Sequence, residues 1–120
     1  MKIALSADGT DLSARLNPRF GRARHFVMVD SETGRLEVID NEQNLDLPQG
    51  AGIQAGQTIV RNGANVLITG NCGPKAFRVL EKANVQVFVG VDGTLQEVLD
   101  RFNAGELKPA QEANVQGHWA

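Results

Sequence analysis

Apolar residues along the chain fall into short runs and helically spaced stripes that predict eight regular elements. The short apolar runs predict five strands, at residues 2–6, 26–30, 36–39, 66–68 and 85–89. Apolar positions three and four residues apart predict three helices, which begin near Gly50, Pro74 and Leu95. The resulting order, β-β-β-α-β-α-β-α, predicts a mixed five-stranded α/β sheet covered by helices.

The starts of the second and third helices carry signals of their own. Pro74 suits the first position of a helix, because its missing N–H would have no partner there. Thr94 and Glu97 form a capping box, in which each side chain satisfies a backbone donor of the first turn.

Length, composition and charge narrow the class of protein. The 120 residues fit one domain, and no apolar run approaches the roughly 20 residues of a membrane span. The N-terminus lacks a signal-peptide pattern, and a single cysteine can form no internal disulfide. A net charge of −2 disfavours nucleic acid, whose phosphates attract strongly basic surfaces. We expect a cytoplasmic protein without a membrane or nucleic-acid partner, with one domain over residues 1–107 and a flexible tail over 108–120.

Cys72 is the residue with the most open chemistry. It lies in the turn from Gly70 to Pro74, between an apolar strand and an amphipathic helix, where α/β proteins often place ligand-handling groups. A thiol at a helix start can be a metal ligand, a reactive nucleophile or a small buried residue. The position alone leaves all three roles open.

Arginines are concentrated in one segment of the chain. Four of the eight arginines fall within ten residues, at Arg15, Arg19, Arg22 and Arg24. Guanidinium groups suit anionic ligands, although solvated loops also collect arginines. If the first and fourth strands are neighbours, this segment and the Cys72 turn start from the same edge of the sheet.

Several short elements resemble one family in their order and spacing. They are Met1-Lys2-Ile3-Ala4, Phe20-Gly21-Arg22-Ala23 followed by Phe26, Asn44, Gly50-Ala51-Gly52, Gly63-Ala64, Gly70 with Gly73-Pro74-Lys75-Ala76, and Gly105-Glu106-Leu107. Together they resemble the dinitrogenase iron-molybdenum cofactor biosynthesis family, the NifX-like domain that also occurs in NifB and NafY. The resemblance covers residues 1–107. Family members commonly carry histidine immediately before Phe-Gly, where this chain has Arg19.

The resemblance implies a fold, a cargo and a set of partners. It implies a ribonuclease H-like motif, with sheet order 3-2-1-4-5, one antiparallel strand and three flanking helices. It also implies a non-enzymatic carrier of an iron-sulfur or iron-molybdenum cluster, either the finished cofactor or its precursor. Such a carrier would work in nitrogen fixation or related metallocluster biosynthesis, with cofactor-assembly or nitrogenase-like proteins as partners.

These inferences define a candidate site. Cys72 is predicted to ligate the cluster, because thiolate is the preferred protein ligand of iron clusters. Arg19 and Arg22 would balance the charge of the cluster. Gly70, Asn71 and Gly73 would form the seat of the cluster with Cys72. His25 and His118 are weaker candidates for metal ligands, because a solvated histidine explains both positions.

Two other function classes stay open. The first is a regulatory or protein-interaction module of the same fold that has lost cluster binding, which Arg19 in place of histidine favours. The second is an enzyme acting on a small anionic substrate, although no set of acids or catalytic triad is recognisable. Gly50-Ala51-Gly52 is interpreted as close helix packing, because a dinucleotide fingerprint would directly follow a strand.

Overall fold

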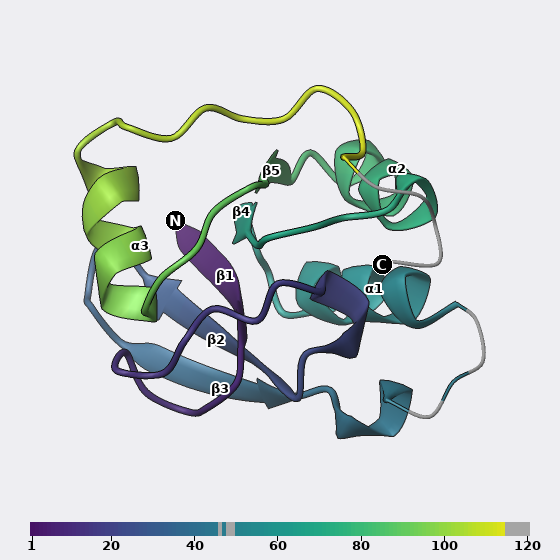
Figure 1. Cartoon of the computed structure of the whole chain (residues 1–120), viewed down its shortest axis with the longest axis horizontal. Helices are drawn as coiled ribbons and strands as arrows, with labels where there is room; N and C mark the ends of the chain where they lie inside the picture. Colours follow the sequence, from purple (N-terminus) through teal and green to yellow (C-terminus); the bar gives the residue numbers. More distant parts are fainter. Residues whose placement is uncertain (46, 48–49, 115–120) are drawn as a thin grey trace.

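Five strands form one mixed sheet in the order β3-β2-β1-β4-β5 (Figure 1). The computed structural model describes residues 1–45, 47 and 50–114. The strands are β1 (Lys2–Ala7), β2 (His25–Asp30), β3 (Leu36–Asp40), β4 (Val66–Ile68) and β5 (Gln86–Phe88). β1, β4 and β5 are parallel neighbours, whereas β2 runs antiparallel to both β1 and β3. The predicted α/β class and the sheet order 3-2-1-4-5 are confirmed.

Helices cover both faces of the sheet. α1 (Ala51–Arg61) and α2 (Pro74–Lys82) lie on one face, and α3 (Leu95–Asn103) lies on the other (Figure 1). Alternate residues of β1 supply the two cores: Ala4 belongs to the cluster with α1 and α2, and Leu5 to the cluster with α3. This follows from the two-residue period of a strand, which turns successive side chains to opposite faces.

The predicted helix starts are confirmed. Pro74 is the first residue of α2. At α3 the Glu97 amide donates to Thr94 Oγ1 at 3.2 Å, and the Thr94 amide donates to Glu97 Oε1 at 2.9 Å. The hydrogen bonds that the Glu97 carboxylate accepts from the Thr94 amide and from the Thr94 side chain hold the pKa of Glu97 below its usual value. The capping box therefore fixes where the chain leaves the segment after β5 and enters α3.

A buried hydroxyl pair joins the C-terminal ends of β1 and β4. Ser6 Oγ lies 2.7 Å from Thr69 Oγ1 and donates to the Asn17 carbonyl at 2.7 Å. Because the Ser6 hydroxyl has one proton and gives it to Asn17, Thr69 is the donor within the pair. Both hydroxyl residues are fully buried. The long loop after β1 is thereby tied to the edge at which β4 ends.

The segment after α3 crosses the molecule from α3 to α2 (Figure 1). We call residues 106–114 the strap. The Ala110 amide donates to the Val87 carbonyl at 2.6 Å, and Ala110 and Ala113 pack against the core under α1 and α2. The part of the predicted flexible tail that the structure describes is therefore held against the domain. His118 lies outside the described residues.

Within those residues, no helix has the length and apolar character needed to cross a membrane.

Candidate functional site

The turn from Gly70 to Gly73 connects β4 to α2 at one edge of the sheet. The amide of Thr69 donates to the Phe88 carbonyl at 2.9 Å, and the Gly90 amide donates to the Gly70 carbonyl at 2.8 Å. The turn is thus continuous with the β4–β5 ladder. α1 and α2 both begin on this side of the molecule, where η1 (Phe20–Arg22) also lies (Figure 1). The edge of the sheet, the Gly70–Gly73 turn and the starts of α1 and α2 therefore lie on the same side of the molecule.

The loop that bears Arg19 is in backbone contact with this turn. Arg19 and Asn71 form an isolated parallel bridge, and the Phe20 amide donates to the Asn71 carbonyl at 3.3 Å. Gly70 lies directly against Pro18: a Cβ at Gly70 would be 2.7 Å from Pro18 Cα. The structure therefore brings together three of the predicted site residues, Arg19, Gly70 and Asn71.

The side chain of Arg22 makes hydrogen bonds to main-chain carbonyls of another loop. Its Nη1 donates to the carbonyl oxygens of Asn44 at 3.3 Å, Leu45 at 3.1 Å and Leu47 at 2.8 Å. These carbonyls belong to η2 (Glu42–Asn44) and the loop that leads to α1. Arg22 therefore fastens that loop to η1, and its role as a charge partner of a ligand stays a prediction.

Cys72 faces the interior of the protein. The residue is fully buried and belongs to the same apolar cluster as Phe20 and Ala76. Burial raises the pKa of the Cys72 thiol to about 12. The group is therefore a neutral thiol at physiological pH, whereas metal ligation and nucleophilic attack both require the thiolate. Among the three roles that the sequence left open, this conformation favours the small buried residue.

His25 lies on the other face of the sheet from Cys72. It begins β2, pairs in register with Ala7 and Asp40, and alternates with Phe26, which shares the core cluster of Cys72. Its Nδ1 is buried and has no hydrogen-bond partner among the described residues. The structure thus does not gather His25 with the other candidate ligands.

The start of α2 adds a positive end to the site. No side chain caps its N-terminus at Gly73, and Lys75 in the first turn is exposed. The unpaired N–H groups of a helix N-terminus attract anions, and the helix dipole adds to that attraction. Together with the charge of Arg19, this end of α2 makes the turn suitable for an anion.

Asn114 is a site residue that the sequence pattern did not reveal. The Cys72 amide donates to Asn114 Oδ1 at 2.8 Å, and Asn114 Nδ2 donates to the Gly70 carbonyl and to Asn71 Oδ1, both at 3.1 Å. The main-chain N–H of Asn114 also donates to the Cys72 carbonyl at 3.3 Å. A single asparagine in a polar segment gives no sequence signal for a partner 42 residues away.

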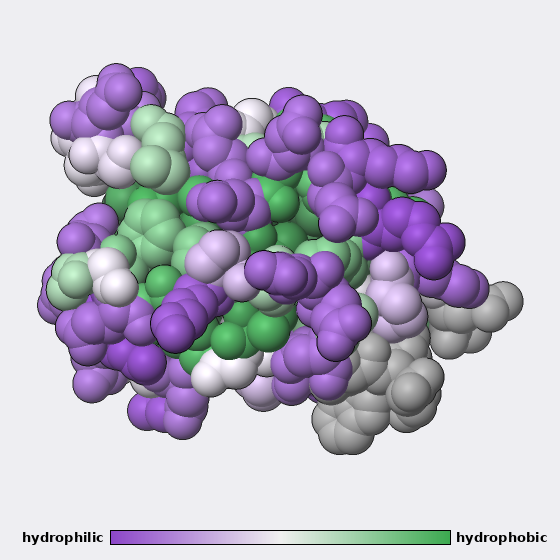
Figure 2. All heavy atoms as spheres, turned by 90° about the horizontal axis from the view of Figure 1, so that it is seen from above, coloured by the Kyte–Doolittle hydropathy of each residue, from purple (hydrophilic) through white to green (hydrophobic). Residues whose placement is uncertain are grey.

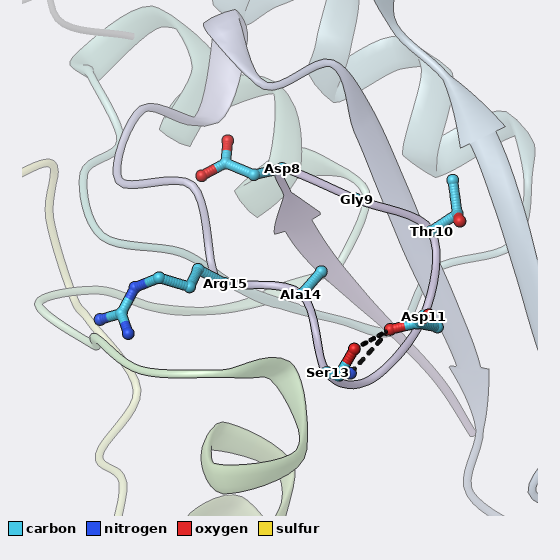
Figure 3. Close-up of a pocket in the computed structure, with 7 residues that line it drawn as sticks. All are labelled: Asp8, Gly9, Thr10, Asp11, Ser13, Ala14 and Arg15. Carbon is cyan, nitrogen blue, oxygen red and sulfur yellow. Dashed lines mark hydrogen bonds between the residues drawn. The ribbon is translucent and has the colours of Figure 1, made fainter.

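A hollow of about 510 Å³ lies in the loop from Asp8 to Arg15, away from the Gly70–Gly73 turn. Figure 3 shows Asp11 joined to Ser13 across the bend, with Arg15 directed away from Asp11. Arg15 forms an exposed ion pair with Asp92 at 3.3 Å, and the Asp8 carboxylate accepts from Asn17 at 2.6 Å. The charged side chains that line the hollow thus already have partners within the chain. Within residues 1–45, 47 and 50–114, no three His, Cys, Asp or Glu side chains gather to hold a metal ion.

Comparison with known proteins identifies the family. The sequence profile described as dinitrogenase iron-molybdenum cofactor matches residues 1–105. The chain belongs to this family. An uncharacterised protein of Methanocaldococcus jannaschii is 32% identical over 111 residues, which are 90% of each chain. The resemblance predicted from the short sequence elements is confirmed.

Two solved structures share the fold and much of the sequence. The apo form of the orange protein from Desulfovibrio gigas has a TM-score of 0.92 and 41% identity, over 95% of this chain and 96% of its own. A candidate NifB protein from Thermotoga has a TM-score of 0.83 and 34% identity, over 97% of this chain and 98% of its own. The family assignment therefore holds over almost the whole length of the chain.

Replacing Gly70 with alanine should disrupt the contact between the turn and the Arg19 loop. The new methyl group would meet the backbone of Pro18, which must move, and such overpacking costs about 2–3 kcal/mol of unfolding free energy. Gly56→Ala is the matched control, because its methyl group would meet the Val79 side chain at 3.3 Å and alanine favours the helix. Urea unfolding of both variants tests this prediction. Equal free energies of unfolding for Gly70→Ala and Gly56→Ala would contradict it.

The buried thiol predicts a loss of stability in alkaline solution. The Cys72 pKa is raised from 9.0 to about 12, so above pH 9 the unfolded chain loses a proton that the folded protein keeps. The free energy of unfolding should therefore fall by up to about 1.4 kcal/mol for each pH unit between these values. Urea unfolding at increasing pH should show a shallower fall for Cys72→Ala. Parallel curves for both proteins would contradict the burial of the thiol.

Proposed function

We propose that this protein binds an anionic metal–sulfur cluster, of the iron-molybdenum or iron-sulfur class, and carries it without chemical change. One observation carries the proposal: the Arg19 loop is bonded to the Gly70–Gly73 turn beside the uncapped start of α2. The family is described by the iron-molybdenum cofactor, and the similar orange protein is known in an apo form, which implies a bound group. Both similarities support a bound cargo, and the geometry of this edge suggests where it binds.

The edge suits an anion that is larger than a single ion. Arg19 and Lys75 supply formal positive charge, and the first turn of α2 supplies N–H groups. Moving an anion from water to a protein surface is costly unless cations and donors replace its hydration. The Gly70–Gly73 turn carries little side-chain bulk beyond Asn71 and the inward Cys72, so its buried backbone would become accessible to a bulky cluster once Asn114 leaves it.

Cys72 enters this proposal as a conditional ligand. In the described conformation its thiol is protonated and faces the core, so direct ligation requires both loss of the proton and opening of the turn. The exposed first turn of α2, with Lys75, can bind a cluster without that cost. We therefore infer that Arg19 and the start of α2 recognise the cluster first. The assignments of Cys72, Arg22 and the turn residues as cluster contacts remain part of the proposal.

A carrier has to release its cargo to other proteins. A site with few bonds to the cluster suits transfer to cofactor-assembly or nitrogenase-like proteins in the cytoplasm. A protein-interaction module that has lost cluster binding is the second candidate. The buried Cys72 and the bonds of Asn114 to the turn favour it, because both groups are already occupied within the chain.

Anaerobic titration with isolated iron-molybdenum cofactor tests the proposal. The wild type should retain cofactor, measured as bound metal and visible absorption. Arg19→Glu should weaken binding about tenfold, because it replaces one charge-assisted contact with repulsion. Arg101→Glu on α3 is the matched control, since it makes the same charge change on the other face, and it should bind like the wild type. Cys72→Ala should weaken binding by less than about threefold.

Each contrary result has a distinct meaning. Equal losses in Arg19→Glu and Arg101→Glu would show that net charge, not this edge, drives binding. Abolished binding in Cys72→Ala would make the thiol a ligand and show that the turn opens. Absence of binding by the wild type and by variants with a loosened strap would reject the carrier and leave the interaction module.

A further inference from the structure

We propose that the strap is an internal competitor for the candidate site: Asn114 occupies the polar groups of the turn, and a bound cluster displaces it. This inference rests on the proposed function. The strap would then set how tightly the protein holds its cargo, and its return would assist release.

Both the oxygen and the nitrogen of the Asn114 side-chain amide make hydrogen bonds to the turn. Its oxygen accepts the Cys72 N–H at 2.8 Å, at the place where an anion would accept it. Its nitrogen donates at 3.1 Å to the Gly70 carbonyl and to Asn71 Oδ1, two acceptors that would repel an anion. One neutral side chain therefore satisfies the donor and covers the acceptors of the predicted seat.

The rest of the strap is held less firmly than a strand or helix. Residues 106–114 form no regular element, and the Ala110 amide makes a single main-chain bond to the β5 edge. A groove of about 350 Å³ runs beside the strap, bounded by α2 and β5. Figure 2 shows hydrophobic atoms in view between polar side chains on this face of the molecule. Segments with few backbone bonds open at low free-energy cost, so the strap can leave without unfolding the sheet.

The competition favours an anion over the asparagine at the Cys72 amide. A hydrogen bond to a charged acceptor is roughly twice as strong as a neutral one. The anion must, however, break all the Asn114 contacts before it reaches the turn. Binding is therefore weaker than it would be at an open turn, and loss of the cluster lets the strap bind again.

Asn114→Ala tests the competition directly. The variant should bind isolated iron-molybdenum cofactor about tenfold more tightly than the wild type, because several side-chain hydrogen bonds no longer oppose the ligand. Without ligand, hydrogen exchange at the Cys72 amide should be faster. Gln111→Ala is the matched control, as an exposed strap residue whose side chain makes no hydrogen bond among the described residues, and it should match the wild type.

Ala110→Pro provides a second test that leaves the turn unchanged. Proline removes the donor to the Val87 carbonyl, so the strap should loosen and cofactor affinity should rise. Circular dichroism shows whether each variant is folded. If only one of Asn114→Ala and Ala110→Pro folds, the cofactor affinity of that variant decides the outcome.

The outcomes separate this inference from the proposed function. Tighter binding by either loosened variant supports the competition, including the case in which only the variants bind. Wild-type binding with equal or weaker binding by the variants overturns the competition and leaves the carrier function standing. Absence of binding by the wild type and both variants overturns the function and the competition together. An unchanged rate of hydrogen exchange at the Cys72 amide in Asn114→Ala would also overturn the competition.

Discussion

The close approach of Pro18 to Gly70 is the contact on which the candidate site depends. No side chain larger than hydrogen fits at Gly70, because a Cβ would lie 2.7 Å from Pro18 Cα and 2.8 Å from its carbonyl oxygen. This approach allows the Arg19–Asn71 bridge to form. Two segments about fifty residues apart in sequence thus become one surface at the edge of the sheet.

Burial and binding are coupled at this edge. The Ser6–Thr69 hydroxyl pair joins β1 to β4, and the turn that follows directs the Cys72 thiol into the core. The inward thiol stabilises the packing, and we propose that main-chain groups, Arg19 and the start of α2 recognise the cargo. A ligand that needed the thiolate would have to disrupt the packing of the core. The same backbone groups support the fold and would form the proposed site, so an internal segment that bonds to them, as Asn114 does, would compete with a ligand.

Local patterns predicted the fold well, because the period of apolar residues reports burial directly. The apolar run of β1 and the Thr94–Glu97 capping box depend on neighbours in sequence, and both were predicted correctly. The strand order came from the family resemblance, since periodicity does not specify which strands pair. The inward direction of Cys72 was not predictable, because a turn has no regular period. The bonds of Asn114 depend on the path of the whole strap, which polar composition does not encode.

The central claim is that an anionic metal–sulfur cluster binds at the turn between β4 and α2. Nuclear magnetic resonance of the ¹⁵N-labelled protein with isolated iron-molybdenum cofactor tests it most directly, because a paramagnetic cluster broadens the signals of nearby amides. The account predicts selective broadening of amides in residues 19–22 and 70–76, together with Asn114. Broadening centred on the loop from Asp8 to Arg15, or no selective broadening at all, would contradict it.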